Sequence, residues 1–137
     1  MKIQISGLVN LSAALVLSLG LLSCDPYPRS GMIIKTGPAS FMKPLVGIST
    51  FVVMFDSLGR VGIEEYGTAY SFDDDVKDSL LYAMDPKVVF DLPAKLHSNE
   101  KVVNIEFPIE THKLRYRAYA KLKGGEIKFG ELVIVNF

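Results

Sequence analysis

The sequence predicts an all-β protein, an antiparallel β-sandwich that follows an apolar N-terminal helix. From Val46 onward, apolar residues recur at every second position, which is the period of a strand and not of a helix. Short apolar runs are separated at regular intervals by Gly, Pro and Asp, and no long run with helical period interrupts them. A chain of 137 residues is suited to one such domain.

The first half of the body contains two clear strands. A short edge strand is expected at 32–35, inside a segment that is otherwise rich in Pro and Gly. Residues 49–56 alternate, with Phe51, Val53 and Phe55 on one face. After a turn at 57–60, residues 61–72 form the next strand, in which Gly62 and Gly67 suggest a bend or bulge. These two strands are expected to pair as a hairpin.

The second half begins with Asp73-Asp74-Asp75, which breaks the alternation. Residues 76–84 fit either a short helix or a strand, 87–91 a short strand, 95–101 a polar loop and 102–107 a strand. Residues 113–123 alternate well, and Gly124-Gly125 predicts a hairpin turn into one last strand, 126–137. The predicted core face of 113–123 consists of Leu114, Tyr116, Ala118, Ala120 and Leu122.

The N-terminus has the pattern of a secretion signal. Lys2 precedes an apolar stretch that ends in Leu21-Leu22-Ser23-Cys24, and this ending resembles the lipobox of bacterial lipoproteins. The resemblance implies cleavage between Ser23 and Cys24, with diacylglycerol attached to the Cys24 thiol. An uncleaved signal anchor is the alternative, since the stretch is just long enough to span a bilayer. Asp25-Pro26 favours cleavage because Pro stops a helix and Asp is costly in lipid.

The predicted organisation therefore has three parts. Residues 1–23 are a lipoprotein signal peptide, 24–44 the lipidated Cys24 and a tether, and 45–137 the β-sandwich domain. Cys24 is the only cysteine, so the domain has no internal disulfide and its stability depends on its core.

The last predicted hairpin carries a family resemblance. Arg117-Ala118-Tyr119-Ala120, a glycine turn and Phe129-Gly130-Glu131 resemble the closing hairpin of fibronectin type III-like domains, the immunoglobulin-like repeats common in Gram-negative surface lipoproteins. The run from Glu65 to Ser71 resembles their third strand. Leu114 stands where the family usually has a corner Tyr, and there is no Trp. The resemblance implies a spacer, adhesion or assembly module and transfers no catalytic residue.

A basic stripe on the outer face of 113–123 is the candidate binding surface. Arg115, Arg117, Tyr119 and Lys121 form its centre, and Lys113 and Lys123 lie at its ends. Such a stripe suits anionic lipid headgroups, an acidic polysaccharide or an acidic protein. The alternative is a solvated face whose charges pair with neighbouring strands, for example with Glu131.

Metal binding, cofactors and catalysis are not expected. Asp73, Asp74, Asp75 and Asp78 have no alternating ligand pattern for Ca²⁺, and a solvated acidic loop explains them. His97 and His112 fall in predicted loops and are too few for a zinc site. Tyr66, Tyr70 and Tyr82 are interpreted as core or rim aromatics. Lys and Arg balance Asp and Glu at 15 each, which gives no reason to expect a nucleic-acid partner.

These patterns predict a non-enzymatic envelope lipoprotein that binds or spaces other envelope components. Its partners would be the membrane, through the lipid, and another envelope protein or a glycan. A carbohydrate-binding accessory of a glycan-capture system is the alternative, and a small hydrolase is the third hypothesis. The outer membrane or cell surface is preferred, although Asp25 next to Cys24 would fit inner-membrane retention in some Gram-negative bacteria.

Overall fold

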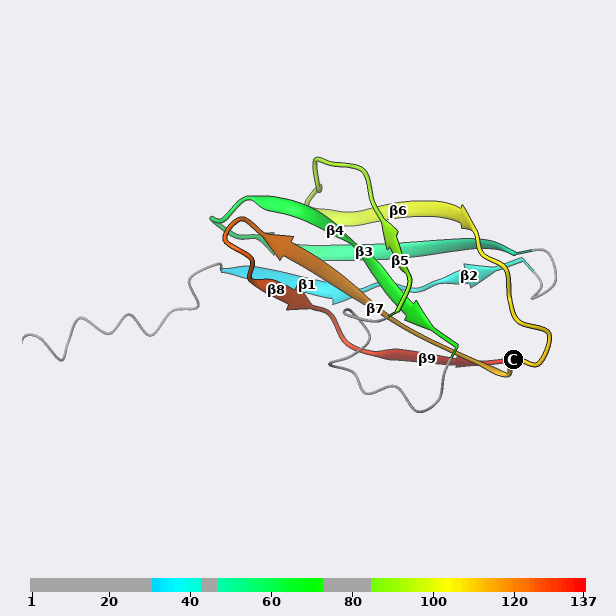
Figure 1. Ribbon diagram of the computed structural model, residues 1–137. Helices are drawn as coiled ribbons and strands as arrows, with labels where there is room; N and C mark the ends of the chain where they lie inside the picture. Colours follow the sequence, from blue (N-terminus) through cyan, green and yellow to red (C-terminus); the bar gives the residue numbers. More distant parts are fainter. Residues whose placement is uncertain (1–30, 43–46, 73–84) are drawn as a thin grey trace, which may run out of the picture.

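The chain folds into two antiparallel sheets that face each other (Figure 1). The computed structural model describes residues 31–42, 47–72 and 85–137, and within these it contains nine strands and no helix. The expectations for the leader, for Ser23 and Cys24, and for residues 76–84 lie outside the described residues. The all-β, antiparallel class predicted from the sequence is confirmed.

The first sheet is built around one long strand. Its central strand, β3, pairs with β1 and then β2 along one edge and with β6 along the other. The bounds are β1 Met32–Thr36, β2 Ser40–Phe41, β3 Ile48–Leu58 and β6 His97–Asn104. The sheet begins at Met32, so the expected edge strand is confirmed and pairing starts ahead of residue 45.

The second sheet has the order β5, β4, β7, and both β8 and β9 pair along the outer edge of β7. Its strands are β4 Ile63–Ser71, β5 Lys87–Val89, β7 Lys113–Leu122, β8 Ile127–Phe129 and β9 Val133–Asn136. The predicted final strand is thus divided in two at residues 130–132. The hairpin turn between β7 and β8 is confirmed, with Gly124 and Gly125 at φ values of 97° and 93°.

The core lies between the two sheets and follows the predicted alternation. Phe51, Val53 and Phe55 of β3 are fully buried. They face the predicted core side of β7, every member of which is buried: Leu114, Tyr116, Ala118, Ala120 and Leu122. Because side chains alternate across a strand, the sequence period alone was sufficient to assign these faces.

The expected hairpin between residues 49–56 and 61–72 is wrong. β3 lies in the first sheet and β4 in the second, and the turn that contains Gly59 (φ 71°) carries the chain across the sandwich. Alternation identifies the buried face of a strand but not its partner, and β3 and β4 both bury one face against the same core. The bulge expected in β4 is the register shift between Ile63 and Glu65, next to Gly62. At Gly67 the strand is regular, and the missing side chain allows the Val88 carbonyl to approach closely.

The expected loop at 95–101 is also wrong, since His97–Asn104 is strand β6. β6 pairs over its full length with β3, and it is an edge strand whose outer face is polar apart from Val102. On its inner face only Val103 is apolar, beside Asn99 and Lys101, so hydrophobic periodicity gave no signal there.

The sandwich has two distinct ends, visible in Figure 1. At the end on the left of Figure 1, which we call the near end, β1 begins and the β3–β4 and β7–β8 turns lie close together. At the far end, the aromatic rings of Phe41, Phe107 and Phe137 meet edge to face, with centroids 5.6 to 5.8 Å apart.

Candidate functional site

The predicted basic stripe lies on the outer face of β7, as the alternation requires. Arg115, Arg117, Tyr119 and Lys121 alternate with the buried core residues of this strand. β4 flanks them on one side, and β8 and β9 on the other. All four residues therefore share the face on which the sequence placed them.

Tyr119 is fully buried, although it points away from the main core. Its ring packs with Ala69 of β4 and with Ile127 and Phe129 of β8, in a second hydrophobic cluster. Its hydroxyl donates a hydrogen bond of 2.7 Å to Oε1 of Glu65. The ring and the hydroxyl of Tyr119 are consequently occupied by the fold.

The charged members of the stripe also have partners. The Arg117 guanidinium lies over the Phe129 ring, 4.1 Å from its centroid, and Lys121 Nζ is 3.6 Å from a carboxylate oxygen of Glu64. Arg115 is half-buried and has an interaction partner as well. Glu131, which the sequence suggested as a partner for this face, instead accepts hydrogen bonds from Thr36 at the sheet edge.

The other residues considered from sequence lie apart from this stripe. His97 begins β6 with a φ of 71°, and the His112 carbonyl accepts a hydrogen bond from the Phe137 amide. In the described part of the chain, no group of three His, Cys, Asp or Glu side chains is placed to hold a metal ion. The four acidic residues from Asp73 to Asp78 lie outside the described residues.

Sequence reasoning missed a buried polar network that joins the two sheets. The Asn99 side-chain amide donates to the Lys95 and Val53 carbonyls, at 2.8 and 3.3 Å, and its Oδ1 accepts from the Lys95 amide at 2.8 Å. The Tyr66 hydroxyl lies 2.9 Å from the Asp91 carbonyl and 3.2 Å from Asn99 Oδ1. The only signal in the sequence is that Asn99 is in phase with Val103 and Ile105.

Burial alters the ionisation of the tyrosines. It raises the pKa of Tyr66, Tyr70 and Tyr116 above the ordinary value of 10.0, because a phenolate is poorly solvated between the sheets. For Tyr66, the negative charge of Asp91 raises the pKa further.

Two hollows lie beside the loop between β5 and β6. A polar one of about 370 Å³ is lined in part by Tyr66, Asp91 and Asn99, whose hydrogen bonds are described above. A more apolar one of about 460 Å³ lies between this loop and the β3–β4 turn, and it is lined by residues 58–63 and 92–94.

No protein-family model, curated protein or solved structure matches this chain. Among the residues that the structure describes, no helix has the length and apolar character needed to cross a membrane. The candidate surfaces are therefore interpreted from their own chemistry.

Proposed function

We propose that this chain is a lipid-anchored protein of the bacterial cell envelope, and that its β-sandwich is a non-enzymatic binding or spacer module. The observation that carries the proposal is the run Leu21-Leu22-Ser23-Cys24 at the end of an apolar leader, with no other cysteine in the chain. The sandwich begins at Met32, soon after this cysteine. A folded module at the end of a short lipid-bearing segment is suited to display at a membrane surface.

We also infer that the sandwich has the fibronectin type III-like arrangement. In an immunoglobulin constant-type domain, the fourth strand pairs with the sheet of the first, second and fifth strands. When the two-residue strand β2 is left out of the count, the strand in the fourth position here is β5, and it pairs with β4 in the other sheet. The first sheet consists of β1, β3 and β6, together with β2. This strand order supports the likeness suggested by the Arg117-Ala118-Tyr119-Ala120 hairpin.

A glycan-binding role has less support on the described surface. Sugar platforms need exposed aromatic faces, and Tyr66, Tyr70, Tyr116 and Tyr119 are buried or half-buried. The preferred role is therefore contact with, or spacing of, other envelope components. Specific binding of the full-length protein to a glycan array would favour the glycan role instead.

The lipid anchor is tested by labelling cells with a fatty-acid analogue. Cys24→Ala should abolish incorporation of the label and leave the fold of the sandwich unchanged, because it removes only the acylated thiol. Ser23→Ala is the matched control, since it keeps a small residue before the cleavage point and should retain the label. Labelling of the Cys24→Ala protein would refute the proposal.

The side of the envelope is tested by treating intact cells with a protease. Exposure at the cell surface predicts that the sandwich is degraded while a periplasmic marker protein stays intact. Protection of the sandwich until the cells are lysed would contradict surface display and restrict its partners to those inside the envelope.

A further inference from the structure

The near end of the sandwich combines a hollow with two exposed leucines. The hollow of about 460 Å³ lies between the β3–β4 turn and the loop that precedes β6. Leu92 and Leu96 of this loop are 53% and 47% exposed, and Pro93 beside them is exposed too. Exposed leucines on a loop at one end of a domain are candidates for insertion into an apolar phase.

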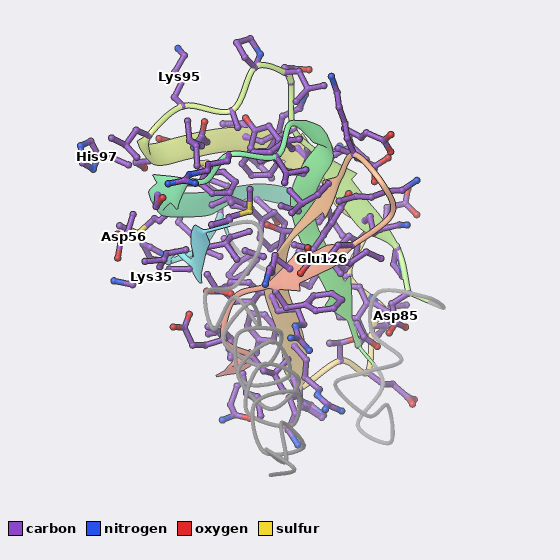
Figure 2. The ribbon with its side chains drawn as sticks, turned by 90° about the vertical axis from the view of Figure 1, so that its left-hand side faces the viewer. Lys35, Asp56, Asp85, Lys95, His97 and Glu126 are labelled. Carbon is purple, nitrogen blue, oxygen red and sulfur yellow. The ribbon has the colours of Figure 1, made fainter. Side chains whose placement is uncertain are left out.

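Exposed cations accompany these leucines. Arg60 lies in the β3–β4 turn, Lys95 in the loop between the leucines, and Lys123 in the β7–β8 turn, where its side chain runs along Gly62. Figure 2 looks onto this end and shows Lys95 at its upper margin, where the side chain projects sideways into solvent. Three carboxylates near these cations are paired with other lysines: Asp56 with Lys35, Asp91 with Lys101, and Glu126 with Lys128. Glu100, which is exposed and lines the polar hollow with Lys95, is the carboxylate that adds negative charge beside this loop.

The proposed anchor enters the fold at this same end. Met32, the first residue of β1, pairs with Leu58 at the end of β3, and it follows Cys24 by eight positions. Eight residues reach at most about 29 Å when fully extended. The 11 residues of β3 span roughly 35 Å, so this tether is too short to let the molecule stand on its far end.

We infer that the near end is a membrane-contact face for an anionic bilayer, an inference that rests on the proposed lipid anchor. Leu92 and Leu96 enter the headgroup region, where burial of apolar surface is favourable. Arg60, Lys95 and Lys123 meet lipid phosphates, whose negative surface potential attracts them. The far end is then presented away from the membrane.

The far end is the natural comparison because it is at least as apolar. Ile109 is 95% exposed, and Met42 is 65% exposed. However, the exposed carboxylates of Glu106 and Glu110 lie on the same loop as Ile109 and are repelled by anionic lipid. Hydrophobicity alone would select Ile109 for membrane contact, whereas the tether and the charges select Leu92 and Leu96.

The experiment uses the full-length lipidated protein, purified and reconstituted in vesicles of phosphatidylcholine with phosphatidylglycerol. Leu92→Cys, Leu96→Cys and, as the matched control, Ile109→Cys are each labelled with a polarity-sensitive fluorophore. Labels at 92 and 96 should shift to shorter emission wavelengths and lose intensity when the lipids carry a nitroxide quencher. The label at 109 should keep the emission of a water-exposed dye. Combining Leu92→Cys with Arg60→Gln and Lys95→Gln should reduce the quenching in anionic vesicles.

The outcomes distinguish failure of the membrane-contact face from failure of the proposed lipid anchor. If all three labels are quenched equally, or only the label at 109, the membrane-contact face is refuted. The same holds if labels at 92 and 96 stay water-exposed while the protein remains vesicle-bound. The wild-type protein is the test of the anchor, because an acylated Cys24 has no thiol to react with maleimide. Labelling of the wild type would refute the proposed anchor instead.

Discussion

The two sheets are joined at opposite edges by different chemistry. We call each of these edge contacts between the sheets a seam. At the first seam, between β1 and the second sheet, the Thr36 hydroxyl accepts a hydrogen bond from the Ala118 amide and donates one to the Glu131 carbonyl. At the second seam, the side chains of Tyr66 and Asn99 bridge the sheets and hold the loop from Asp91 to Lys95.

The difference lies in how closely the backbones approach. At the first seam, a Cβ at Gly130 would lie 2.5 Å from the Thr36 amide nitrogen, so only glycine allows this contact. At the second seam a loop separates the sheets, and two longer polar side chains span the gap. The first seam therefore depends on the small size of Gly130, and the second on the hydrogen bonds of Tyr66 and Asn99. Different substitutions should therefore destabilise the two seams.

The largest effect is expected for Gly130→Ala at the first seam. The new methyl group would overlap backbone atoms of β1, which cannot move without breaking the pairing with β3. The free energy of unfolding, measured in urea, should fall by about 3 kcal/mol or more. Gly62→Ala is the control, since its methyl group would meet only the flexible Lys123 side chain. Equal stability of the two variants would contradict the close approach at this seam.

Asn99→Ala should have the next largest effect, at the second seam. It removes both amide donors and the carbonyl acceptor, and it leaves the buried Val53 carbonyl and the partly buried backbone groups of Lys95 without these partners. A loss of about 2–3 kcal/mol in unfolding free energy is expected. Ser98→Ala, at the exposed neighbouring position, should change stability by less than about 0.5 kcal/mol. A similar small change for Asn99→Ala would show that the network does not hold this seam.

Thr36→Val tests whether the first seam needs a hydroxyl as well as small size. Valine keeps the shape of threonine but leaves the Ala118 amide without its acceptor, which should cost about 2 kcal/mol. Thr36→Ser keeps the hydroxyl and should lose less than about 1 kcal/mol. If valine and serine were equally tolerated, shape and not hydrogen bonding would determine this contact.

Tyr66→Phe should have the smallest effect at neutral pH, about 1 kcal/mol, because it removes a single hydroxyl donor. The pKa of Tyr66 is raised in the fold, so the folded protein holds this proton more tightly than the unfolded chain does. Its contribution to stability is complete below about pH 10 and is lost as the pH rises through the folded pKa. The free energy of unfolding, measured at increasing alkaline pH, should therefore fall less steeply for Tyr66→Phe than for wild type.

The local features of the fold could be predicted from the sequence. The alternation in β3 and β7 depends only on neighbouring residues along one strand, and so does the glycine turn at Gly124 and Gly125. The outward position of Arg115, Arg117, Tyr119 and Lys121 followed from the same period.

The pairing of the strands could not be predicted in the same way. β3 and β4 are adjacent in sequence but lie in different sheets, and β6 is an edge strand whose inner face is mostly polar and therefore shows no apolar period. The division between β8 and β9 falls where Gly130 and Glu131 meet Thr36, a contact between residues about 95 positions apart. The burial of Tyr119 likewise depends on Glu65 and Phe129 from neighbouring strands.

By itself, the sequence determined which residues form the core faces of the principal strands, because side-chain direction has a fixed period along a strand. It also limited cysteine chemistry to a single position, Cys24. Only the tertiary structure decided which strands pair and how the two seams join the sheets. It also decided that Leu92, Leu96 and three cations share the end where β1 begins. These relations depend on contacts between distant parts of the chain, and no local period in the sequence encodes them.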